Sequence, residues 1–110
     1  MDDGYIEAVK VTGIEWDAAN RRHFAERHRC RRQEVDDVLS GRCPPSRIVE
    51  QRRRPGDERR LLIYGRTCRG RYLVIVAAPR PDGILSPITG WPFSDRDLEW
   101  YLRWQRSLRR

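Results

Sequence analysis

Two apolar segments of strand length in the middle of the chain give its clearest hydrophobic pattern. They cover residues 60–64 and 71–78, and the short connection between them contains Gly70. The second segment shows almost no alternation of polar and apolar residues, which is typical of a central strand buried on both faces. The sequence therefore predicts an antiparallel β-hairpin at the middle of a sheet, with arginines at its ends.

Weaker patterns on both sides of this hairpin predict six further elements. They are strands over residues 10–16, 46–53 and 84–89, and helices over residues 18–28, 33–40 and 95–107. Gly41 is a natural stop for the second helix, Ser94 is the expected N-cap of the third, and Pro87 indicates an edge position for the last strand. The order predicts one α+β domain over residues 1–110, with N-terminal helices and a C-terminal helix packed on a four- to five-stranded, mainly antiparallel sheet.

The last predicted helix carries a wider apolar arc than a helix needs for packing on one surface. We expect Leu98, Tyr101 and Leu102 to enter the core, whereas Trp100 and Trp104 lie at its margin. The simplest interpretation is that all these aromatic residues belong to the core or its rim. Exposed aromatics beside arginines are also typical of interface anchors, so Trp100 and Trp104 are the candidates for binding a protein partner.

The charge of the chain narrows the classes of partner. The 110 residues carry a formal net charge of +7, and Lys10 is the only lysine among the 23 basic residues. A guanidinium group can bind two phosphate oxygens at once, so this composition favours RNA or DNA. An acidic protein partner accounts for the charge equally well. Residues 1–9 read as a loose lead-in and residues 108–110 as a basic tail.

The cysteines and the apolar runs indicate a cytoplasmic protein. The chain has an odd number of cysteines, and they are widely spaced: Cys30, Cys43 and Cys68. This pattern predicts reduced thiols rather than a disulfide framework. The first ten residues lack the apolar segment of a signal peptide. No apolar run approaches the roughly 20 residues of a membrane span, so we expect no membrane partner.

Cleavage of RNA without a metal ion is a chemistry that these residues could support. It needs a base for the 2′-OH, an acid for the leaving 5′-oxygen, and cations near the phosphorus. His28 is the best acid or base, since histidine alone titrates near neutral pH without help, although a structural hydrogen bond would also explain it. We assign catalytic roles to His28, Arg60 and Arg66, and substrate-binding roles to Arg71, Arg69 and His23. Arg60, Arg66 and Arg71 are predicted to share one electropositive surface that His28 borders.

Two other chemistries fit the sequence less well. His23 and His28 are five residues apart, so they do not share a helix face as metal ligands would, and we expect no metal and no cofactor. The two N-terminal helices and the basic turn between them suggest a DNA-binding helix-turn-helix. However, the exposed side of the second helix would present Glu34, Asp36 and Asp37, which phosphates repel.

Three groups of residues together have the order and spacing of a known family. They are Ile14-Glu15-Trp16-Asp17 with Arg27-His28 and Glu34-Val35, then Arg60 with Gly65-Arg66 and Gly70-Arg71-Tyr72-Leu73-Val74, and finally Ile88-Thr89-Gly90-Trp91 with Ser94, Asp97 and Tyr101. Over about residues 14–104 the chain resembles the BrnT-type toxins. These are small RelE-like ribonucleases of bacterial type II toxin–antitoxin modules.

The resemblance implies a RelE-like fold and an RNA endonuclease that inhibits translation without a cofactor. It also implies a cognate antitoxin as protein partner, with DNA contacted only through the antitoxin complex. Three positions depart from the family: Arg29 stands where a glycine usually follows the histidine, Asn20 where a lysine is common, and Trp91 where an arginine follows the last strand. The Trp91 departure favours an alternative, a non-catalytic protein of the same fold that acts through protein or nucleic-acid binding.

Overall fold

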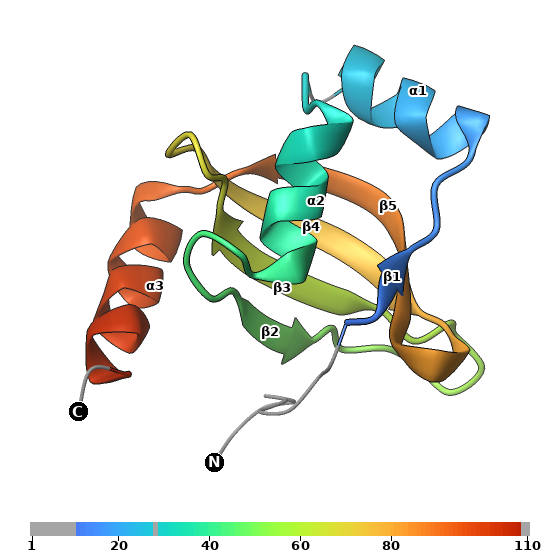
Figure 1. Ribbon diagram of the computed structural model, residues 1–110. Coiled ribbons are helices and arrows are strands. Elements are labelled where there is room, and N and C mark those ends of the chain that lie inside the picture. The colour runs from blue at the N-terminus through green and yellow to red at the C-terminus, as the bar shows by residue number, and fades with distance from the viewer. Residues whose placement is uncertain (1–10, 28, 109–110) are drawn as a thin grey trace.

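A computed structural model describes residues 11–27 and 29–108 of the chain. Its helices and strands are β1 (Gly13–Ile14), α1 (Ala18–Arg27), α2 (Arg32–Ser40), β2 (Arg47–Glu50), β3 (Leu61–Arg66), β4 (Tyr72–Pro79), β5 (Ile84–Pro92) and α3 (Asp95–Ser107), with a 3₁₀ turn at Pro81–Gly83 (Figure 1). Among these residues, no helix has the length and apolar character needed to cross a bilayer.

The five strands form one sheet in the order β1-β5-β4-β3-β2. Strands β3 and β4 pair antiparallel with Ile63 opposite Ile75, and both Val74 and Ile75 are fully buried. The predicted hairpin at the middle of the sheet is therefore confirmed, as is the α+β class. The sheet is mixed, because β1 runs parallel to β5 whereas the other pairs are antiparallel.

Strand β5 differs from the sequence prediction in length and in position. It continues to Pro92, and it lies between β1 and β4, so the edge position inferred from Pro87 is wrong. Proline is tolerated there because β1 pairs only with Ile84 and Leu85 and does not extend alongside Pro87. A register shift also places a bulge in β5 beside this proline, because Val76 pairs with Thr89 and Ala77 with Pro87, which leaves Ile88 as the extra residue.

The two N-terminal helices cover one face of the sheet and enclose the main core (Figure 1). Every second side chain of a strand points toward this face, where it contacts apolar residues of α1 and α2. The core residues are Phe24, Cys30, Val35, Val38, Leu39, Leu61, Ile63, Leu73, Ile75, Ala77 and Leu85. Gly41 ends α2 in the left-handed conformation (φ 62°), as its position in the sequence predicts.

Helix α3 packs on the opposite face through an aromatic cluster. Tyr101 is fully buried, and its hydroxyl donates a hydrogen bond to the Pro45 carbonyl at 2.8 Å. Trp100 lies edge-on to Tyr64, with ring centroids 4.8 Å apart, and both Trp100 and Trp104 are half-buried. The bounds of α3 and its Ser94 cap are as predicted, because the capping box with Asp97 forms.

The Tyr101 hydroxyl makes a pH-dependent contribution to the stability of the fold. Burial, followed by the nearby Tyr72, raises the pKa of Tyr101 from 10.0 to about 12. A group whose pKa is higher in the folded state stabilises the fold while it is protonated. Its contribution is therefore complete below pH 10 and is lost as the pH rises through about 12.

We predict that Tyr101→Phe lowers the free energy of unfolding at pH 7 by about 1 kcal/mol, because the hydrogen bond to Pro45 is lost. The variant should also lose less stability than the wild type on going from pH 9 to pH 11. Urea unfolding at the two pH values measures both effects. Equal alkaline losses in the two proteins would contradict the assigned role of the buried hydroxyl.

Candidate functional site

A cleft of about 530 Å³ lies between the start of α2 and the turn that joins β3 to β4. Its lining comes from the segment before α2, from α2 itself, from the residue after its C-cap and from the turn. The residues are Arg29, Arg31, Gln33, Glu34, Asp37, Arg42, Thr67, Cys68, Arg69 and Arg71. The cleft therefore brings together segments that are up to 42 residues apart in the sequence.

The turn has a defined backbone conformation. Gly70 takes a φ of 98°, which favours glycine, and its N–H donates to the Thr67 carbonyl at 2.9 Å. The buried Thr67 hydroxyl accepts from the N–H of Arg71 at 3.0 Å. These bonds fix the backbone from which Arg69 and Arg71 extend.

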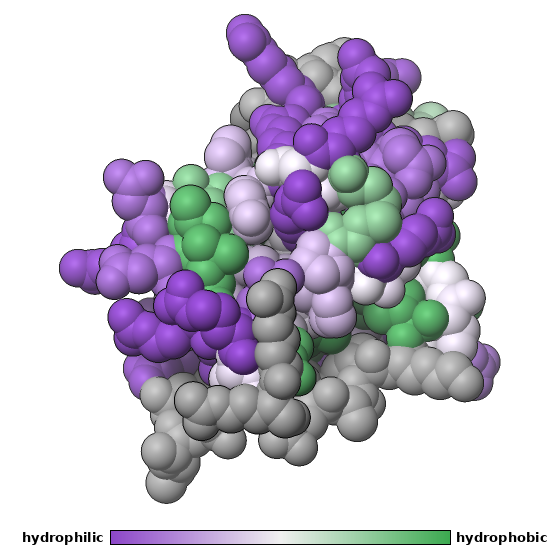
Figure 2. All heavy atoms as spheres, turned by 60° about the vertical axis from the view of Figure 1, so that its left-hand side comes forward, coloured by the Kyte–Doolittle hydropathy of each residue, from purple (hydrophilic) through white to green (hydrophobic). Residues whose placement is uncertain are grey.

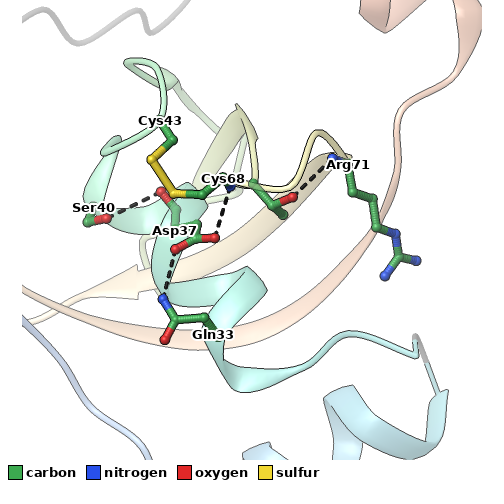
Figure 3. Close-up of a disulfide and its surroundings, with 7 residues drawn as sticks. Gln33, Asp37, Ser40, Cys43, Cys68 and Arg71 are labelled. Atoms are coloured by element: carbon green, nitrogen blue, oxygen red, sulfur yellow. Dashed lines mark hydrogen bonds between the residues drawn. A yellow bond between two sulfur atoms is a disulfide. The ribbon is translucent and has the colours of Figure 1, made fainter.

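The Asp37 carboxylate joins this turn to α2 (Figure 3). One oxygen accepts from the Cys68 N–H at 3.0 Å and the other from the Gln33 side chain at 2.8 Å. Asp37 is only 4% exposed, so the sequence-based expectation that it faces solvent is wrong. A buried carboxylate must be hydrogen-bonded, and here the turn supplies the donor that a single sequence does not reveal.

A disulfide between Cys43 and Cys68 is a second link to this turn, and it joins the turn to the loop between α2 and β2 (Figure 3). The prediction of reduced thiols is wrong for these two residues, whose Cα atoms lie 4.9 Å apart although 25 residues separate them in sequence. Cys30 is not part of a disulfide and is buried in the core. Burial raises the pKa of the Cys30 thiol, which keeps it protonated and unsuited to nucleophilic attack.

The cleft carries an excess of positive charge. Five arginines line it, against the two carboxylates Glu34 and Asp37. Arg71 is 3.2 Å from Glu34 and also donates to the carbonyl of Arg29 at 2.9 Å. The other four arginines are exposed, and none of them forms an ion pair with a carboxylate among the described residues.

Glu34 has a positioning role in this arrangement. Its carboxylate accepts from the N–H of Arg31 at 3.0 Å, which satisfies a backbone donor at the start of α2, and it also holds the guanidinium group of Arg71. One side chain therefore orients both walls of the cleft. Because Glu34 already accepts from the Arg31 N–H and the Arg71 side chain, the excess positive charge of the cleft lies on the four exposed arginines.

The structure separates the arginines that the sequence analysis grouped together. Arg69 and Arg71 line the cleft. Arg66 lies opposite Tyr72, on the α3 face, with its guanidinium group beneath Gly70. Arg60 precedes the other end of β3, roughly 20 Å from Arg66 at about 3.3 Å per residue. The prediction that Arg60, Arg66 and Arg71 share one surface is therefore wrong.

The remaining candidates lie away from the cleft or outside the described residues. His23, on α1, is half-buried and lies edge-on to Phe24, and it does not line the cleft. His28 falls outside the described residues, so its role stays a prediction. Trp100 and Trp104 lie on the opposite face of the sheet. Figure 2 shows strongly hydrophilic residues over much of the visible surface, interrupted by small hydrophobic patches.

Sequence reasoning missed three arginines of the cleft. Arg29 and Arg31 belong to a basic run before α2, and that run was the available signal. Arg42 follows the C-cap of α2, and no local pattern distinguishes it from other surface arginines. Among the described residues, no group of three or more His, Cys, Asp or Glu side chains could hold a metal ion.

This geometry can bind an anion with several charged oxygens, because guanidinium groups approach one space from both walls. Comparison of the chain with models of known protein families and with curated protein sequences gave no match. The functional assignment therefore depends on the residues and on their arrangement.

We predict that Cys43→Ser and Cys68→Ser each lower the free energy of unfolding by roughly 3.5 kcal/mol, because a closed loop of about 25 residues is lost from the unfolded state. Urea unfolding measures the change. The double variant should be no less stable than either single one, since both remove the same bond. Additive losses would show that the two residues stabilise the fold independently.

Proposed function

We propose that this protein is an RNA-cleaving toxin of the BrnT type, with a RelE-like fold, from a bacterial type II toxin–antitoxin module. It inhibits translation and needs no metal or other cofactor. Translation places its action in the cytoplasm, a location that the cysteines no longer support because Cys43 and Cys68 form a disulfide. The observation that carries the proposal is the cleft at the start of α2, where four exposed arginines lack a described carboxylate partner. The order of motifs in the sequence supports the choice of family.

The chemistry of the cleft favours a phosphodiester ligand. Exposed guanidinium groups on two walls can bind the oxygens of one phosphate, or of two successive phosphates, with forked hydrogen bonds. The nearby N-terminus of α2 adds a positive partial charge of the helix dipole. These features are independent of base identity, so they attract the backbone of RNA without selecting a sequence.

Cleavage requires an acid and a base in addition to these cations. We assign the role of the base that takes the 2′-OH proton to His28, which directly precedes the cleft residue Arg29 in the chain, and water protonates the leaving 5′-oxygen. Arg69 and Arg71 then stabilise the charge that develops on the phosphate oxygens. This assignment replaces Arg60 and Arg66, because those residues lie at opposite ends of β3.

A second function, RNA or protein binding without cleavage, is favoured by a specific observation. Trp91 occupies the position of the family arginine, and its side chain is 40% exposed on β5. An indole cannot donate charged hydrogen bonds to a phosphate. Within the described lining of the cleft, the carboxylates are both engaged by hydrogen bonds, which leaves no unoccupied general base there.

For the antitoxin we propose the face that carries α3. Arg47 stacks on Trp100 with its guanidinium carbon 4.2 Å from the ring centroid, and it also lies 5.7 Å from Trp104. Aromatic rings with a stacked arginine are characteristic of binding hot spots. An antitoxin segment with apolar and acidic residues would cover both. DNA is then contacted only by the antitoxin in the complex.

We predict that Arg31→Ala and Arg69→Ala each weaken binding of a short RNA about tenfold, since a charged hydrogen bond contributes about 1.5 kcal/mol. Fluorescence anisotropy at several salt concentrations measures the effect. Each variant should also reduce the salt slope by about 0.7. Arg96→Ala, an exposed arginine on α3, is the matched control and should bind as the wild type does. Unchanged affinity in both cleft variants would contradict the proposal.

Cleavage separates the two candidate functions. His28→Ala should retain RNA affinity and lose cleavage of a labelled RNA in the presence of a chelator, because binding needs only the arginines. If the wild-type protein binds the RNA but leaves it intact under the same conditions, the non-catalytic function is the correct one.

We predict that Trp100→Ala and Trp104→Ala each weaken antitoxin binding by roughly thirtyfold, the cost of about 2 kcal/mol for a desolvated indole. Isothermal titration gives the dissociation constants once circular dichroism has shown that each variant folds. Trp91→Ala changes an exposed indole on β5, on the same face of the sheet, and tests whether α3 rather than β5 carries the contact. A loss of affinity in Trp91→Ala alone would place the interface on β5 and refute the assignment to α3.

A further inference from the structure

A second basic surface lies at the other end of the sheet from the cleft. The connection between β2 and β3 forms a turn that we call the arginine tip, residues 51–60. It holds five arginines in ten residues, namely Arg52, Arg53, Arg54, Arg59 and Arg60. Figure 1 shows this connection at the lower right, whereas the β3–β4 turn that lines the cleft lies at the upper left.

The arginine tip is a turn with its own internal bonds. The Asp57 carboxylate accepts from the N–H of Arg54 at 3.1 Å, and the Asp57 N–H donates to the Arg54 carbonyl at 3.1 Å. The side chain of Arg53 donates to the Asp57 carbonyl at 3.2 Å. Gly56 supplies the positive φ of 91° that the turn requires. A hollow of about 290 Å³ results, lined by Gln51, Arg52, Arg53, Asp57, Glu58 and Arg60.

Most of the charge of the tip is not neutralised by its neighbours. Arg59 pairs with Glu50, and Glu58 is 2.7 Å from Arg80. The remaining four arginines of the tip are exposed, and no carboxylate among the described residues forms an ion pair with them. Four guanidinium groups on one turn repel one another, and a polyanion relieves that repulsion.

We propose that the arginine tip is a second contact for the phosphate backbone of the same RNA that occupies the cleft, an inference that rests on the proposed function. The two surfaces are separated by the length of β3, roughly 20 Å at about 3.3 Å per residue. With one phosphate per 3.4 Å along a stacked strand, an RNA needs about six nucleotides to span that distance. A tetranucleotide in the cleft does not reach the tip.

The two contacts predict a dependence on RNA length. A long RNA held at one site presents its other phosphates to the second site at high effective concentration, so the two sites reinforce each other. A short RNA gains nothing from the tip. The arginine tip therefore selects for longer single strands, and the cleft provides the contact that every length shares.

The experiment compares oligo(U) of 4 and 16 nucleotides by fluorescence anisotropy. The triple variant Arg52→Ala, Arg53→Ala, Arg54→Ala should weaken 16-mer binding at least tenfold and reduce its salt slope by about 2, with 4-mer binding unchanged. The control variant Arg96→Ala, Arg103→Ala, Arg106→Ala removes the same formal charge from α3. It should bind both oligonucleotides as the wild type does.

A tip variant that binds the 16-mer as tightly as the α3 control does would overturn the inference. A polyglutamate peptide bound with the same dependence on the tip would also overturn it, because the tip would then be a site for any polyanion. The cleft variant Arg69→Ala keeps the two proposals distinct: unchanged 4-mer binding refutes the cleft while leaving the result for the tip standing.

Discussion

The buried Asp37 carboxylate is the interaction on which the arrangement of the cleft depends. It connects α2 to the β3–β4 turn through the Cys68 N–H at 3.0 Å, and Gln33 satisfies its second oxygen. The disulfide from Cys43 joins the α2–β2 loop to the same turn. Because both links end on the turn, the backbone that carries Arg69 and Arg71 cannot move independently of the helix. The charged groups that face a ligand are thereby held in place before it binds.

The sheet distributes the arginines of this basic protein over separate surfaces. Side chains alternate between the two faces of a strand, so Arg66 and Arg71 lie on opposite faces although they flank the same turn. The length of β3 separates Arg60 from both. This separation limits the repulsion between arginines. Each cluster of arginines is small enough for a few phosphates to neutralise its charge.

Patterns local in sequence were enough to predict the β3–β4 hairpin and α3. The uninterrupted apolar run at 72–78 and the Ser94 capping box each specify an element within one segment. The features that form the cleft are not local. The Cys43–Cys68 bond joins residues 25 apart, and Asp37 is buried only because the turn provides its donor. A charged residue in a helix otherwise reads as solvent-exposed, and an odd number of cysteines gives no pairing.

The central claim is that RNA occupies the cleft between α2 and the β3–β4 turn. Photo-crosslinking of a 4-thiouridine tetranucleotide, followed by mass spectrometry of the peptides, tests it most directly because it locates the ligand without altering a residue. Crosslinks should fall on residues that line the cleft, such as Arg29, Arg31, Gln33, Arg42 and Arg69. Crosslinks confined to Tyr64, Trp91 or α3 would contradict the account, because they would place the RNA on the opposite face of the sheet.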